Sequence, residues 1–119
     1  MKSLFEVNDE NELLALYRVI VEGKFNEDPE DTVISGSPFV ANAVNRIADK
    51  FIELKPHDSE WREIDENHRF VSIVKKRVSE CSKWNEWPKN ERIEYLNILL
   101  SPFRVNEHVL QKLTKHKNV

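Results

Sequence analysis

The chain has 119 residues, 36 of them Leu, Ile, Val or Phe, enough apolar content to build one domain, residues 1–119, around its own core. It carries 33% charged residues, a net charge of −3 and two glycines, a composition that favours helices and lacks the strongly basic balance of nucleic-acid-binding proteins. The apolar runs are too short for a membrane span, and a single cysteine without a secretory signal makes the cytoplasm the expected location.

The first predicted helix runs from near Asp9 to the region of Gly23. Asp9 followed three residues later by Glu12 fits a capping box. Five residues repeat at helical spacing: Leu13, Leu16, Tyr17, Ile20 and Lys24. Leu14 and Val21 widen the apolar face of this helix. Because this face is wide, we expect the helix to be well buried.

Residues 26–36 form the principal predicted loop, because they show no helical period and contain Pro29 and Gly36. The second helix begins directly after it, with Ser37 as its N-cap and Pro38 at its first position. Pro56 ends this helix. Its apolar residues make two adjacent rows: Phe39, Val40, Ala43, Val44, Ile47, Ala48, Phe51 and Ile52.

A third helix is predicted over residues 59–82, capped by Asp58 or Ser59. Its apolar stripe follows the same three-and-four spacing: Trp61, Ile64, His68, Val71, Val74, Val78 and Cys81. On such a helix Asp65 and His68 would share one turn, where their side chains could chelate a metal ion. A histidine on an apolar stripe is more often a core residue, so we predict no metal site and no cofactor.

The remaining sequence predicts two more helices after an interruption at residues 84–88. The fourth helix contains Leu96 and Leu99 and is closed by Pro102, and the fifth begins at the capping residue Asn106. The predicted fold class is therefore all-α: an irregular bundle of about five helices in a single domain, with the first two helices packed against the third and fourth.

The sequence contains no catalytic signature. A Gly-x-Ser-x-Gly elbow is missing, the Ser35–Pro38 segment lacks the glycine pattern and lysine of a phosphate-binding loop, and the acidic loop does not supply the ligand register of an EF-hand. We therefore predict that the protein is not an enzyme, with a small metal-dependent enzyme built on His68 and Asp65 as an alternative.

The two halves of the chain carry opposite charge. Residues 1–60 have 6 Lys or Arg against 13 Asp or Glu, a net charge of −7, whereas residues 61–119 have 12 against 8, a net charge of +4. The simplest explanation is that acidic and basic helices complement one another on one surface. The alternative is an acidic face that meets a basic partner.

These observations favour a protein-binding module, such as an immunity- or antitoxin-type inhibitor that masks a basic, nuclease-like protein. The predicted partner-binding residues are four loop carboxylates and two tryptophans: Glu27, Asp28, Glu30, Asp31, Trp84 and Trp87. Either at least one tryptophan is a surface anchor, a role in which tryptophan is enriched, or the pair packs in the core. Nucleic-acid binding would use the basic second half and is the less favoured alternative: Lys75, Lys76, Arg77, Lys112, Lys115 and Lys117.

Overall fold

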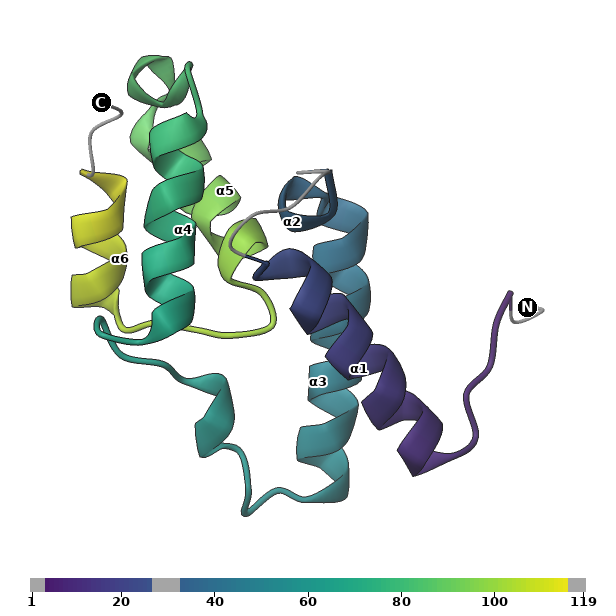
Figure 1. Ribbon diagram of the computed structural model, residues 1–119. Helices are drawn as coiled ribbons and strands as arrows, with labels where there is room; N and C mark the ends of the chain where they lie inside the picture. The colour runs from purple at the N-terminus through teal and green to yellow at the C-terminus, as the bar shows by residue number, and fades with distance from the viewer. Residues whose placement is uncertain (1–3, 27–32, 116–119) are drawn as a thin grey trace.

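A computed structural model describes residues 4–26 and 33–115 of the protein (Figure 1). Its helices are α1 (Glu10–Lys24), α2 (Val33–Gly36), α3 (Pro38–Leu54), α4 (Arg69–Glu80), α5 (Lys89–Leu100) and α6 (Glu107–Thr114), with short 3₁₀ helices η1 (Glu60–Arg62) and η2 (Trp84–Glu86). The predicted all-α bundle of about five helices is confirmed, since α2 adds only four residues to the five longer helices. None of the helices in these ranges combines the length and apolarity needed to cross a membrane.

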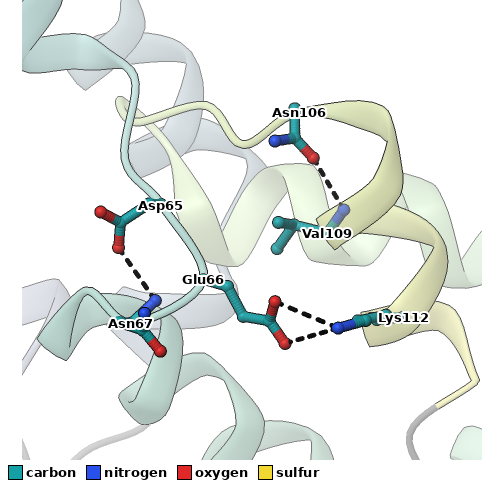
Figure 2. A network of polar contacts seen from close by, with 6 residues as sticks. All are labelled: Asp65, Glu66, Asn67, Asn106, Val109 and Lys112. Atoms are coloured by element: carbon teal, nitrogen blue, oxygen red, sulfur yellow. Dashed lines mark hydrogen bonds and ion pairs between the residues drawn. The ribbon is translucent and has the colours of Figure 1, made fainter.

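Three helices begin at the capping residues that the sequence predicts. Asp9 Oδ1 accepts a hydrogen bond from the Asn11 amide at 2.8 Å, which replaces the expected capping-box bond to Glu12. Ser37 Oγ accepts from the amide of Val40 at 3.2 Å. Asn106 Oδ1 accepts from the amide of Val109 at 2.9 Å (Figure 2). Each bond satisfies an amide that the first turn of a helix leaves unpaired.

The third helix is shorter than predicted, because residues 59–68 do not belong to it. The backbone in this region bonds to a distant segment instead: the amide of Ile64 donates to the carbonyl of Arg104 at 2.9 Å, and the amide of Arg104 donates to the carbonyl of Arg62 at 2.7 Å. A segment whose backbone groups pair with another part of the chain cannot form the i to i−4 bonds of a helix. The periodic stripe over 59–68 was therefore wrongly assigned to helix.

Two side chains then set the real start of α4. Asp65 Oδ1 accepts a hydrogen bond from the amide of Asn67 at 2.9 Å and turns the chain (Figure 2). His68 is the N-cap of α4, and its Nδ1 accepts from the amide of Phe70 at 3.1 Å. Asp and His used in this way compete with helix formation, which the spacing of apolar residues does not reveal.

The loop before α4 is also tied to the last helix. The Nζ of Lys112 on α6 lies 3.0 and 3.1 Å from the two carboxylate oxygens of Glu66 (Figure 2). The hydrogen bond and the charge of Lys112 lower the pKa of Glu66 below its usual value. The pair is exposed, so it orients the loop more than it stabilises the fold.

The bundle consists of two layers, named here the N-terminal layer (α1, α2 and α3) and the C-terminal layer (α4, α5 and α6). Helix α5 joins them, because it packs against α2 and α3 on one side and against α4 and α6 on the other (Figure 1). The main hydrophobic core lies in the C-terminal layer and includes one N-terminal residue, Phe25: its other members are Ile64, Val71, Ile73, Val74, Val78, Trp84, Leu96, Leu99, Leu100, Val109 and Leu113.

Helix α1 is much less buried than predicted. Lys24 is its only buried residue, while Leu16 and Val19 keep 36% and 69% of their surface exposed. The apolar positions of α1 cover more of its circumference than its packing against α2 and α3 can bury. One part of that wide apolar face therefore remains on the surface.

A buried lysine fastens α1 to the other layer. Lys24 Nζ donates a hydrogen bond to the carbonyl of Ile98 on α5 at 2.6 Å and a longer one to the carbonyl of Ser35 on α2 at 3.4 Å. Burial lowers the pKa of Lys24 to about 8. A single polar side chain thus joins three helices at the point where the two layers meet.

A buried arginine fastens α3 in a similar way. Arg62 Nε donates to the carbonyl of Pro102 at 2.7 Å, and its two terminal nitrogens reach side-chain oxygens of α3, Asp49 Oδ1 at 2.6 Å and Asn45 Oδ1 at 3.2 Å. The planar guanidinium satisfies three acceptors at fixed angles. Arg62 therefore fixes the position of α3 relative to the segment that follows α5.

Candidate functional site

The predicted acidic cluster lies outside the described residues: Glu27, Asp28, Glu30 and Asp31. Asn26, the residue directly before this cluster, is among the described residues. The buried Arg77 of α4 donates a hydrogen bond from Nη2 to the carbonyl of Asn26, and its Nη1 lies 3.7 Å from a carboxylate oxygen of Glu80. A cation of the basic half thus holds the residue that precedes the acidic loop, and the role of the loop in binding stays a prediction.

The two predicted tryptophans occupy different environments. Trp84 is entirely buried, with the Arg92 guanidinium 5.5 Å from the centre of its ring and Tyr95 at 6.4 Å between ring centres. It belongs to the core, the second of the two roles weighed for the pair, and presents no surface to a partner. Trp87 is half-buried and lines a shallow hollow of about 270 Å³ with Tyr95 and other residues of α5. Trp87 alone keeps a surface for contact.

The shared helical turn on which the alternative of a metal site at Asp65 and His68 depended does not form. The two residues do not share a helical turn, because the helix begins only after His68. An oxygen of Asp65 and Nδ1 of His68 each accept a backbone amide hydrogen. Within residues 4–26 and 33–115, His, Cys, Asp and Glu do not form a group of three or more placed to hold a metal ion. The observation that favoured a metal-dependent enzyme is thereby lost.

The basic residues considered for nucleic acid are partly committed to internal contacts. Arg77 is buried, and Lys112 is paired with Glu66. A phosphate backbone is recognised by cations that can release their counterions to it, so cations already neutralised within the fold contribute little. These contacts reduce the basic surface that this alternative needs.

The surface that the sequence did not single out lies on α1 and the segment before it. Five apolar residues line a shallow groove of about 350 Å³ together with Glu12; this surface, the α1 strip, consists of Phe5, Val7, Ala15, Leu16 and Val19. Phe5 is 75% exposed and Val19 69% exposed. Contiguous apolar side chains of this kind on a folded surface mark interaction sites.

The α1 strip continues towards α2. Gly23 lies four residues after Val19, one turn further along α1, and Ile34 Cγ2 is 3.5 Å from the position that a Cβ at Gly23 would take. The exposed side chain of Ile34 on α2 therefore lies beside this end of α1, at a distance where an added Cβ would make ordinary van der Waals contact. The spacing of positions 12, 15, 16, 19 and 23 was visible in the sequence as a second stripe on the first helix, but Leu16 was assigned to the buried face.

Apolar exposure and negative charge coincide in the same half of the chain. Every large, exposed hydrophobic residue in the described ranges lies between residues 4 and 54: Leu4, Phe5, Leu16, Val19, Val33, Ile34, Phe39 and Leu54. The charged residues of residues 4–23 are five carboxylates and one arginine: Glu6, Asp9, Glu10, Glu12, Glu22 and Arg18. Glu12 lines the groove of the α1 strip itself, and the stretch of chain that contains the strip is acidic.

Comparison with known proteins gives no family assignment. Searches against protein-family models, curated proteins and solved structures found no match to this chain. The candidate site therefore rests on the surface geometry and charge described above.

Proposed function

We propose that this protein is a protein-binding module whose partner is a basic protein that docks on the α1 strip. The observation that supports this is the coincidence of the large exposed apolar residues with the half of the chain that carries a net charge of −7. Exposed apolar side chains supply the contact area that slows dissociation, and surrounding carboxylates speed the encounter with a cationic partner.

The shape of the α1 strip favours an amphipathic segment as the docking element. Ala15, Leu16 and Val19 lie on one face of α1, and Phe5 and Val7 stand beside them in the same groove. A partner helix recognised in this way would place apolar residues on the strip and Lys or Arg opposite Glu12 and Glu22. An inhibitor of the immunity or antitoxin type, which masks a cationic surface, is the specific form of this proposal.

The proposal is tested by capturing the tagged protein from its own cell extract and identifying what elutes by mass spectrometry. We expect one basic protein in fixed stoichiometry, lost at high salt. A Val19→Glu variant places a charge in the strip and should weaken this capture by about a hundredfold, because an unpaired charge at a contact is costly to bury. The Leu54→Glu variant is the matched control, since Leu54 is exposed but lies outside the groove.

Two outcomes would contradict the proposal. Equal capture by the Val19→Glu and Leu54→Glu variants would show that the strip is not the contact. Light scattering that finds a dimer in the wild type and a monomer in the Val19→Glu variant would show that a second copy of this chain covers the strip. Neutralising the four loop carboxylates should lower the association rate while leaving the fold intact.

A further inference from the structure

A second cavity lies between α1, α3 and η1 and is independent of the α1 strip. Its volume is about 380 Å³, within the range of roughly 300–1,000 Å³ typical of small-molecule sites. On α1 it is lined by Glu10, Leu14 and Tyr17, with the exposed Asn11 at its edge. Positions 10, 14 and 17 lie on the opposite side of the helix from Leu16 and Val19, since residues three and four apart share a face.

Three aromatic rings from three different elements form the inner wall of this cavity: Tyr17 of α1, Phe51 of α3 and Trp61 of η1. The Tyr17 ring lies 5.5 Å from Phe51 at an interplanar angle of 86° and 5.8 Å from Trp61 at 82°. Perpendicular rings present both edges and faces to the space between them. All three side chains are half-buried, so the wall is fixed by the fold and still reaches the opening.

The wall is apolar and carries no charge. Burial raises the pKa of Tyr17 to about 12, with the nearby Arg62 opposing this effect. The phenol is therefore neutral at any physiological pH. The Trp61 indole N–H donates to the backbone carbonyl of Asp58 at 2.9 Å and so is already satisfied. The interior thus offers aromatic surface, and its indole donor is not available to a ligand.

The charged residues of the cavity stand at its exposed rim. Glu10, Lys55 and Asp58 are all exposed, and the Nζ of Lys55 lies 3.9 Å from an oxygen of Glu10. With two carboxylates and one lysine, the rim has a net negative charge. Two interactions would attract a cation to this cavity: cation–π contact with the faces of the rings, and Coulomb attraction to the carboxylates of the rim.

We propose that this cavity binds a quaternary ammonium group, of the kind found in choline or in a trimethylated lysine side chain. Aromatic faces stabilise such a cation, and its methyl groups fill apolar space. A free ammonium or guanidinium would bring N–H donors into an interior lined by rings, where each unpaired donor is costly. The ligand class follows from this combination of aromatic wall, apolar interior and negative rim.

The first test is a nuclear magnetic resonance titration that follows the indole N–H signal of Trp61. Choline is compared with 3,3-dimethylbutanol, which has the same shape with a neutral carbon in place of the nitrogen. We expect saturable shifts with choline and binding at least about tenfold weaker with the neutral compound. Equal binding of the two, or no shift with choline in large excess, would overturn the proposal.

The second test changes the rim charges, which are exposed and do not hold the fold together. Lys55→Gln frees Glu10 and should tighten choline binding about threefold, while Asp58→Asn should weaken it by a similar factor. Neither variant should change the binding of 3,3-dimethylbutanol. Weaker choline binding in Lys55→Gln would show that the rim charges do not attract the bound cation, and would overturn the proposal.

The third test removes one ring. Phe51→Leu should weaken choline binding about fivefold to thirtyfold, and Phe39→Leu is its matched control on the same helix, because Phe39 is exposed and outside the cavity. Unchanged binding in a folded Phe51→Leu variant would overturn the proposal. A short peptide with trimethyl-lysine then identifies the source: tighter binding than choline points to a modified protein side chain, and weaker binding to a small molecule.

Discussion

The two layers of the bundle are built on different principles. The C-terminal layer encloses a core of large apolar side chains such as Trp84, Leu96 and Leu99, each almost wholly buried. In the N-terminal layer the fully buried apolar residues of α3 are small, Ala41, Val44 and Ala48, and α1 buries only Lys24. Since apolar burial is the main source of stability, the C-terminal layer carries most of the free energy of unfolding.

The N-terminal layer is attached by polar contacts and a few apolar ones. Lys24 and Arg62 each join it to backbone carbonyls of the segment from α5 to Pro102. Such contacts specify position more than they contribute stability, because each buried cation also carries a desolvation cost. A layer held in this way can keep apolar side chains on its outer surface, where the α1 strip lies, and it supplies two of the three rings of the aromatic cavity.

The largest test of this comparison is a matched pair of leucine substitutions. Leu99→Ala leaves a cavity in the C-terminal core and should lower the free energy of unfolding by about 2–5 kcal/mol. Leu16→Ala, on the exposed side of α1, should lower it by less than about 1 kcal/mol. Both values come from chemical denaturation at neutral pH. Equal losses would show that α1 is buried in solution and that the two layers do not differ as described.

The second test uses the buried lysine at the junction of the layers. The pKa of Lys24 falls from 10.5 to about 8 on folding, so between these values the unfolded chain binds more protons than the folded chain. The free energy of unfolding therefore rises with pH in this window, by at most about 1.4 kcal/mol per unit and by about 1.6 kcal/mol in total from pH 8 to pH 9.5, because the folded-state lysine is still half protonated at pH 8. Denaturation curves across this range measure the rise.

The Lys24→Met variant is the control for this pH dependence. Met has a similar length and no titrating group, and the carbonyl of Ile98 keeps its hydrogen bond from the Ser101 hydroxyl at 2.6 Å. The rise in stability between pH 8 and 9.5 should disappear in this variant, and its persistence would assign the effect to another group. The measurements stop below pH 10, because Tyr17 has the opposite effect on stability. Its pKa is raised on folding, so its contribution to the free energy of unfolding is lost as pH rises above 10.

Local signals in the sequence predicted the helix starts well. Ser37, Asn106 and Asp9 lie directly before α3, α6 and α1 and cap them through side-chain oxygens. The groups that form an N-cap lie within one turn of each other along the chain, so a short stretch of sequence is enough to predict it. The predicted interruption at residues 84–88 and the end of the fourth helix near Pro102 were correct for the same reason.

Features that depend on distant contacts were not predictable. The start of α4 is displaced because Arg62 and Ile64 pair with Arg104, about 40 residues away, which helical spacing alone cannot show. The burial of α1 was overestimated because periodicity reveals how wide an apolar face is and not how much of it neighbouring helices cover. The α1 strip and the aromatic cavity were missed for this reason, since both depend on how α1 is placed on α3.

The smallest and most discriminating test compares two N-caps, Ser37 in the N-terminal layer and Asn106 in the C-terminal layer. Replacing either residue by Ala should lower the free energy of unfolding by about 1 kcal/mol, which corresponds to amide hydrogen exchange about fivefold faster. Suppose that the N-terminal layer opens while the core stays folded. The Asn106 cap is then present in both the closed and the open state, so its loss does not change the free energy of that opening. Asn106→Ala should then speed exchange in α4 and α5 and leave α1 and α3 unchanged, whereas Ser37→Ala should speed exchange in both layers. A fold that unfolds as one unit would respond equally to both substitutions, because every opening would then break both caps.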